Sequence, residues 1–524
     1  MAARRPSVER QEAVPFLVRC VGATLALLLV AWSAPASSPA AEGTMTWGVH
    51  VSLTPAFFDP ADATGTALPL MVYYAVHDAL VRPLPGQRMG AALAQSWSQS
   101  PDGLSYEFVL RKGVKFHDGE PVTAEDVKFS FERYRGAGAG PFKTRLASID
   151  VLDSQRIRFR FKQPWPDFMT FYGTPATGAG WIVPKKYVEK VGDDGFKKAP
   201  IGAGPYRFVS FTPGVELVLE ANDSYWRKTP SVKRLVFKSV SEEETRLAML
   251  KRAEADIAYS IRGPLAEELK RTPGLTLMPT YPSGTFWLVF PEQWTDPKSP
   301  WVDRRVRLAA NHAIDRQAIN QAETLGFSKI TGSIIPYTFE FFWQPPILAY
   351  DVTKARRLLA DAGYPNGFDA GDYHCDASYA NLGEAAVNYL NAAGIRAKLR
   401  PLERAAFIAQ NRDKKLKNII QTGSGAAGNA STRLDAFVAA GGTFTYGTYP
   451  DIEGLIREQA GEIDLKRREA TLHRIQQLIH DKAMFAPIWQ LAFINGYGPR
   501  VAESGLSLIA GHPYSAPYED LKLK

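Results

Sequence analysis

The chain has 524 residues, of which 45% are hydrophobic, 22% charged and 11% aromatic. This composition is that of a globular protein and excludes a disordered, fibrous or many-span membrane protein, while the length corresponds to about three to four domain-sized units. The two cysteines, Cys20 and Cys375, are too few for a disulfide scaffold or a four-thiolate zinc site. The net charge of +8 is spread along the chain, which argues against nucleic acid as a partner.

The first 41 residues have the three-part pattern of a secretory signal. Arginines precede an apolar run over residues 21–32, and small residues follow up to Ala41. The run has 12 residues, fewer than the ~20 of a membrane-spanning helix. We therefore predict a signal peptide over 1–41, a periplasmic protein and no membrane span after cleavage; a short buried helix is the alternative.

Beyond this segment, short strands and helices alternate, which predicts a mixed α/β fold. Alternating apolar residues predict half-buried antiparallel strands at 106–110 and 157–161. Thr123, with Asp126 three residues later, predicts a capped helix N-terminus. The helix that follows has Val127, Phe131 and Tyr134 on one face.

Three later elements are predicted from the same signals. The apolar segment 285–290 reads as a strand, and Thr353 as the cap of a helix over 354–362 that Gly363 ends. A long helix begins at 465. Its predicted apolar stripe consists of Leu465, Leu472, Ile475 and Ile479.

Two segments indicate where the chain crosses between lobes. Residues 291–300 are rich in Pro, Asp and Lys, and Ala486-Pro487 follows the last long helix. The tail after them is too short for a domain, so we expect it to pack on the first lobe. Two crossings would form a hinge suited to closure around a ligand.

The strongest motif runs over residues 93–135, LAQSWSQSPDGLSYEFVLRKGVKFHDGEPVTAEDVKFSFERYR. It resembles the extracytoplasmic solute-binding proteins of ABC importers, family 5, the peptide and nickel type. Further landmarks follow in the order of that family: PIGAGPY at 200–206, the segment 303–316, and LLADAGYPNGF at 358–368. The resemblance covers about residues 45–520.

The resemblance implies a two-lobed periplasmic-binding-protein (venus-flytrap) α/β fold of type II, with an extra subdomain near 91–199. Combined with the two crossings, it predicts lobe I at 42–287, lobe II at 288–486 and a C-terminal return to lobe I at 487–524. It also implies a monomeric receptor that closes on a peptide-like or other small polar solute and delivers it to the transmembrane subunits of an ABC permease. Neither catalysis nor a cofactor is implied.

The resemblance also indicates which residues contact the solute. The predicted ligand-binding residues are Thr64, Gly65, Thr66, Phe286, Trp287, Thr422, Ser424, Ala427 and Asn429. An ordinary loop glycine at 65 and a core tryptophan at 287 are the alternatives.

The chain departs from the family at one of these segments. Peptide-binding relatives carry a tryptophan and an aspartate near the positions of Ser424 and Ala427, and that aspartate pairs with a free α-ammonium. Because it is missing, we expect di- and tripeptides to bind weakly, unless Asp62 or Asp435 replaces it. Backbone amides of the Gly- and Ser-rich segment suit a neutral, hydroxylated or anionic solute.

A secreted hydrolase, or a sensor or chaperone module on the same fold, is the alternative function. Gly423-Ser424-Gly425 lacks the spacing of a nucleophile elbow, and no His-Glu-x-x-His occurs. His374-Cys375-Asp376 could be taken for metal ligands, but consecutive residues on a strand point to opposite faces. We therefore predict neither an enzyme nor a metal site.

Overall fold

The computed structural model describes residues 41–62, 68–136 and 138–524. The predicted signal peptide and the predicted site residues Thr64, Gly65 and Thr66 lie outside this part of the chain. In the described part, no helix is both long and apolar enough to cross a membrane.

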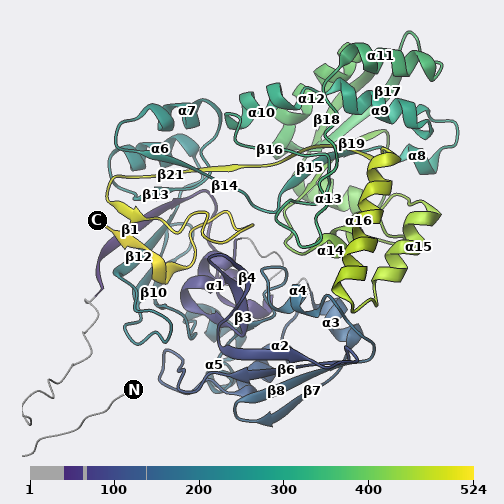
Figure 1. Cartoon of the computed structure of the whole chain (residues 1–524). Coiled ribbons are helices and arrows are strands. Elements are labelled where there is room, and N and C mark those ends of the chain that lie inside the picture. The colour runs from purple at the N-terminus through teal and green to yellow at the C-terminus, as the bar shows by residue number, and fades with distance from the viewer. Residues whose placement is uncertain (1–40, 63–67, 137) are drawn as a thin grey trace, which may run out of the picture. The chain divides into compact units, whose positions relative to one another are not determined.

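The first large sheet has seven strands of mixed direction. In spatial order they are β10 (Tyr206–Thr212), β11 (Glu216–Ala221), β12 (Val232–Ser239), β1 (Glu42–Val49), β13 (Ile257–Ala258), β21 (Phe493–Tyr497) and β14 (Thr276–Thr280). β1 lies between β12 and β13 and is parallel to both, and its Trp47 stacks on Phe237 in the core. Although β21 comes from the end of the chain, it runs antiparallel to β13 and β14 (Figure 1).

The second large sheet has six strands. Their order is β16 (Lys329–Ile330), β20 (Phe485–Gln490), β15 (Thr285–Val289), β19 (Ile419–Ser424), β17 (Phe368–Asp376) and β18 (Ile395–Leu402). β15 is buried at all five residues because it has paired strands on both sides and a hydrophobic core on each face. Its successive side chains alternate between these cores, Phe286 on one face and Trp287 on the other.

A four-stranded antiparallel sheet lies within the segment predicted as a subdomain. It consists of β5 (Ala94–Gln99), β6 (Ser105–Leu110), β8 (Arg156–Phe161) and β7 (Leu146–Asp153). The alternating burial of β6 and β8 confirms both strand predictions. α2 (Ala124–Glu132) begins with the predicted capping box of Thr123 and Asp126.

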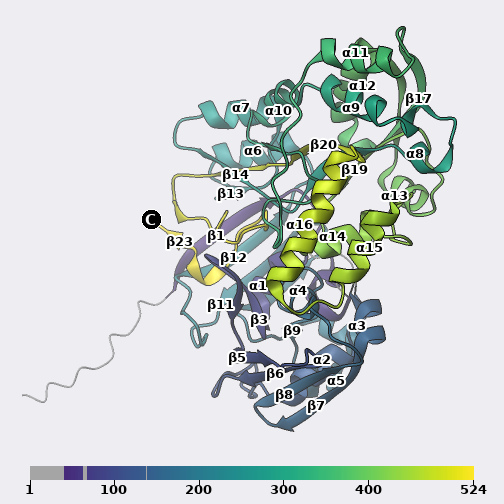
Figure 2. The same ribbon diagram turned by 45° about the vertical axis from the view of Figure 1, so that its right-hand side comes forward.

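Helices cover the sheets and supply the cores. Those before the six-stranded sheet are α1 (Leu70–Val76), α3 (Ala139–Arg145), α4 (Phe168–Tyr172), α5 (Lys185–Lys198), α6 (Glu243–Lys251) and α7 (Gly263–Arg271). Those between β15 and β20 are α8 (Glu292–Thr295), α9 (Arg304–Ala313), α10 (Arg316–Thr324), α11 (Val352–Asp361), α12 (Ala380–Ala393), α13 (Arg404–Arg412), α14 (Ala430–Phe437), α15 (Pro450–Gln459) and α16 (Leu465–Asp481). α15 and α16 pack side by side (Figure 2).

Two helix predictions are wrong in detail. α11 is capped by Asp351, whose Oδ1 accepts from the Lys354 N–H at 2.8 Å, so the helix begins before Thr353. Leu465 is 62% exposed because it lies in the first turn of α16, and only the later residues of the predicted stripe are buried.

Within its described residues the chain passes between the two large sheets twice, at 281–284 between β14 and β15 and at 491–492 between β20 and β21. The Leu491 N–H donates to the Gly284 carbonyl at 2.8 Å, so the crossings lie side by side. The predicted boundaries after residues 287 and 486 fall inside β15 and β20. The segment 291–300, expected to mark the first crossing, contains α8 and follows β15, and Pro487 of the second expected crossing lies within β20, where it is paired with Trp287.

Candidate solute-binding cleft

Two adjoining cavities of about 330 and 670 Å³ share the end of β19 as a wall. We call them the aromatic compartment and the outer compartment. Gly423, Ser424 and Gly425 line both, as do Leu68 and Phe407. A Cβ atom at Gly425 would meet no other atom within 4 Å, so this wall presents backbone to the cavities.

Six rings from separate parts of the chain line the aromatic compartment: His50, Phe286, Tyr379, Phe407, Phe493 and Tyr514. His50 follows β1, and its ring stacks on Tyr514 with centroids 5.8 Å apart. Phe286 meets Tyr379 edge to face at 4.6 Å. Residues attached to both large sheets therefore form this compartment.

The aromatic compartment carries no uncompensated charge among its described residues. Burial, then the nearby Arg246 and Arg262, lowers the pKa of His50 to about 4, so its imidazole is neutral at pH 7. Arg404 and Asp376 form an ion pair with each other at 2.7 Å, and the Arg404 side chain is 60% exposed. The remaining lining is apolar or neutral.

The outer compartment is mainly apolar and includes one acid. Its apolar lining includes Ala56, Phe57, Leu68, Pro69, Phe437 and Phe444. Asp62 also lines it but forms ion pairs with Arg135, at 2.5 Å, and Lys197. Burial raises the pKa of Asp62, but these two cations outweigh it and hold the pKa below its usual value. Asp62 is therefore already paired and does not replace the missing acid.

The structure brings three predicted residues to these compartments: Phe286, Thr422 and Ser424. Trp287 does not line them, because its side chain points to the opposite face of β15. It is fully buried and packs against Phe437 with centroids 5.0 Å apart. Trp287 is thus the core tryptophan that the sequence left as an alternative.

Ala427 and Asn429 line a third cavity of about 470 Å³. Asn429 caps α14, and its Oδ1 accepts from the Thr432 N–H at 3.0 Å. Its Nδ2 donates to Asp167 Oδ1 at 2.7 Å and to Thr170 Oγ1 at 3.1 Å. Asn429 is 1% exposed, and these protein contacts occupy both ends of its amide.

Asp167 is the centre of a buried polar group, the Asp167 cluster, which we define as Asp167, Asn429, Ser431 and Arg468. Arg468 Nη2 lies 2.6 Å from Asp167 Oδ2, and Ser431 Oγ donates to the same oxygen at 3.2 Å. Asp167 stands at the N-cap of α4 but makes no capping hydrogen bond. Its carboxylate instead joins α4 to α14 and α16.

One residue that positions the cleft was not predicted. Arg433 of α14 is 3% exposed and donates to the carbonyls of Ser424 and Ala426, at 3.1 and 3.3 Å, and to Thr285 Oγ1 at 2.7 Å. Burial lowers the pKa of Arg433 to about 9, which leaves it charged at pH 7. The sequence signal that could have indicated Arg433 was an arginine at a buried position of a helix that directly follows the Gly- and Ser-rich segment.

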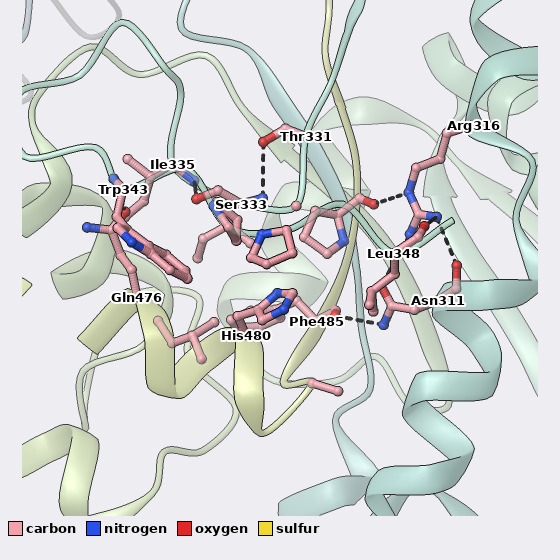
Figure 3. Close-up of a pocket in the computed structure, with 17 residues that line it drawn as sticks. Asn311, Arg316, Thr331, Ser333, Ile335, Trp343, Leu348, Gln476, His480 and Phe485 are labelled. Atoms are coloured by element: carbon pink, nitrogen blue, oxygen red, sulfur yellow. Dashed lines mark hydrogen bonds between the residues drawn. The ribbon is translucent and has the colours of Figure 1, made fainter. Parts of the chain in front are cut away.

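A further, much smaller space lies between α9, α16 and β20. It has a volume of about 30 Å³, room for about one water molecule. Figure 3 shows Arg316 at one end, where its Nε donates to the Pro487 carbonyl at 2.7 Å and its Nη1 to the Asn311 carbonyl at 2.8 Å. Arg316 therefore holds β20 in place.

The described residues contain no group of three or more His, Cys, Asp or Glu side chains placed to hold a metal ion. Within the same part of the chain, the only hydrogen bond to Ser424 Oγ comes from the Ala426 N–H, at 3.4 Å. No described His, Asp, Glu or Lys side chain hydrogen-bonds this hydroxyl, so the geometry does not favour a serine nucleophile.

Comparison with known proteins agrees with this architecture. The family model of bacterial extracellular solute-binding proteins, family 5 (middle), matches residues 88–445. The chain belongs to this family. It has the two-lobed type II periplasmic-binding-protein fold that the sequence resemblance implied, and the family consists of binding proteins for transport.

Two curated relatives and one solved structure illustrate the likeness. The glutathione-binding protein GsiB of Salmonella choleraesuis is 29% identical over 316 residues, 59% of this chain and 60% of that protein. Heme-binding protein A of Haemophilus influenzae is 30% identical over 304 residues, 53% and 54% of the two chains. The match thus spans less than two thirds of these relatives. The periplasmic binding protein DppA of Helicobacter pylori, solved with the peptide STSA, has a TM-score of 0.72 and 24% identity over 92% of this chain and 98% of that one.

Proposed function

We propose that this protein is an extracytoplasmic receptor that binds a small solute between two lobes and delivers it to the transmembrane subunits of an ABC permease. The observation that carries the proposal is the cleft, whose lining comes from both large sheets although, in the described part of the chain, only two crossings connect them. Such a pair of crossings allows hinge closure around a ligand. Family membership supports transport over hydrolysis.

The proposed lobes follow the two large sheets. We place the first lobe on the seven-stranded sheet together with the subdomain at 91–199 and the C-terminal return, and the second on the six-stranded sheet. The hinge then lies at 281–284 and 491–492, a few residues from the predicted boundaries.

The solute we propose is peptide-like or another small solute that does not need a free α-ammonium. Ala427 provides no carboxylate, and Asp62 is already paired with Arg135 and Lys197. By their names, GsiB binds glutathione and heme-binding protein A binds heme, so related proteins bind chemically different solutes. The apolar walls of the outer compartment favour a solute with apolar as well as polar groups.

The Asp167 cluster fits a role in closure. Asp167 belongs to the subdomain, whereas Asn429, Ser431 and Arg468 belong to helices of the proposed second lobe. Opening the lobes would expose a carboxylate and a guanidinium that contact each other at 2.6 Å. We propose that this cluster stabilises the closed form.

Mass spectrometry of the solute released by denaturing the purified protein, followed by calorimetric titration, tests the binding proposal. Small-angle scattering with and without that solute should show a smaller radius of gyration in the loaded protein. An unchanged radius at saturation would contradict closure, and turnover of the solute would favour the hydrolase alternative. Deleting the permease should abolish uptake without affecting binding.

We also propose that the receptor works in the periplasm as a monomer after removal of the signal peptide. The basic flank, the apolar run and the small residues up to Ala41 support this location. N-terminal sequencing of the exported protein should give a start between Ser37 and Glu42. A protein that retains Met1 in the cytosol would contradict it.

A further inference from the structure

We propose that the aromatic compartment binds an aromatic ring that carries a hydrogen-bonding group, and that this ring is one end of the transported solute. That the ring belongs to the transported solute rests on the proposed function. Ring binding itself follows from the rings, the hydroxyls and the charge of the compartment.

The rings of the compartment are held by the protein independently of any ligand. Phe286 is fixed in a strand paired on both sides, and Tyr514 is 4% exposed and packs on Tyr259 with centroids 4.9 Å apart. His50 stacks on Tyr514, and Tyr379 packs on Phe286. A planar group entering the 330 Å³ space therefore meets preformed ring faces and edges. Preformed contacts reduce the entropy lost on binding.

Two hydroxyls of the compartment have no partner in the described part of the chain. Neither Tyr379 Oη nor Tyr514 Oη takes part in a hydrogen bond with a described residue, although other polar groups nearby do. Gln421, for example, accepts from Tyr373 Oη at 2.9 Å and donates to the Tyr379 carbonyl at 3.2 Å. Both rings line the cavity and a phenolic hydroxyl can donate and accept, so these hydroxyls are available to a polar substituent on the ring.

The electrostatics of the compartment favour an uncharged ligand group. His50 is neutral at pH 7, and Arg404 and Asp376 are paired with each other at the rim. A charged group placed here would lose water without gaining an opposite charge. A phenol- or indole-like group is planar, carries a hydrogen-bonding substituent and has no charge, so it fits this compartment. The outer compartment leaves space for the rest of the solute.

Phenol and cyclohexanol form a matched pair of probes, equal in ring size and both carrying a hydroxyl. We expect the mature protein, freed of solute, to bind phenol about 3- to 10-fold more tightly than cyclohexanol, the range given by one favourable ring–ring contact. Chemical-shift titration measures both affinities, and a crystal soaked in phenol locates the ring. Indole should also bind.

Substitutions of Tyr379 test whether the preference for phenol over cyclohexanol arises in the aromatic compartment. Tyr379→Ala should remove the preference for phenol, Tyr379→Phe should keep ring binding but weaken phenol by a few-fold, and Tyr350→Ala should change nothing. Tyr350 is 43% exposed and lies outside both compartments, so it is the control for loss of an aromatic residue. Circular dichroism confirms folding of each variant.

Equal affinity for phenol and cyclohexanol, or a preference that survives Tyr379→Ala, would overturn the inference. If phenol binds as expected but uptake does not depend on a permease, the proposed function fails and the ring site remains. If a permease-dependent solute without any aromatic ring is identified, the proposed function holds and the link between the ring site and that solute fails.

Discussion

The Asp167 cluster and the aromatic compartment both join segments that lie far apart in the chain, but they are built from opposite chemistry. In the cluster a buried carboxylate meets a guanidinium, an amide and a hydroxyl, and each has a partner within the chain. In the compartment the walls are rings, and two hydroxyls have no partner among the described residues. We propose this difference as a criterion for telling a closing contact from a ligand-binding surface: the first pairs its own polar groups, and the second leaves some free for a ligand.

Removing the carboxylate of the cluster should have the largest effect. Asp167→Ala removes the carboxylate that contacts the buried Arg468 and leaves it only the longer-range attraction of Asp435 and Glu340, so we expect the free energy of unfolding to fall by about 3 kcal/mol. The radius of gyration of the solute-free protein should also increase. Urea denaturation and small-angle scattering measure the two effects. Asp150→Ala, which removes an exposed ion pair with Arg160, is the control and should change stability by less than about 1 kcal/mol.

Asn429 tests whether a predicted ligand contact belongs to the cluster instead. Asn429→Ala removes a helix cap and two buried hydrogen bonds, and we expect a loss of about 1–3 kcal/mol. In a double-mutant cycle with Asp167→Ala the losses should be strongly non-additive, because both variants remove the same contact. Additive losses would show that Asn429 acts elsewhere, for example on the solute.

Acidification tests the neutral state of the compartment. Folding lowers the pKa of His50 from 6.5 to about 4, so the unfolded chain binds a proton in this interval and the folded protein does not. Its contribution to stability is complete above pH 6.5 and is lost as the pH falls towards 4, by about 2 kcal/mol between pH 7 and 5. Urea denaturation of the wild type and of His50→Phe should differ in pH dependence by this amount. Phenol affinity should stay constant from pH 8 to 5, and a loss of affinity near pH 6 would contradict a neutral His50.

The smallest expected effect on stability is at the wall of the cleft. Among the described residues Ser424 makes only one long hydrogen bond through its side chain, so Ser424→Ala should change the free energy of unfolding by less than about 0.5 kcal/mol. Because Ser424 lines both compartments, we expect the affinity for the natural solute to fall by up to about 10-fold, the value of one neutral hydrogen bond. Ser378→Ala, an exposed position outside both compartments, is the matched control. An unchanged affinity would remove Ser424 from the site.

Local patterns predicted the secondary structure well wherever neighbours in sequence make the decisive contacts. The alternation in β6 and β8 and the box formed by Thr123 and Asp126 depend on residues at most a few positions apart. The cap of α11 was misplaced because Asp351 and Thr353 both suit a helix start, and only the backbone path showed that the carboxylate reaches the Lys354 N–H. The long motif in the first third of the chain indicated the family, and thereby the fold class.

The sequence by itself determined that segment 285–290 is an apolar strand and that the acid expected near Ala427 is missing. Which faces Phe286 and Trp287 occupy was decided only by the tertiary structure, because β15 has a hydrophobic core on each side. The same holds for Asn429, whose partner Asp167 lies 262 residues earlier. Contacts between residues so far apart in the sequence leave no periodic or local signal. Side chains that bind a solute can be distinguished from those that stabilise the fold only after each buried polar group has been matched with its partner in the tertiary structure.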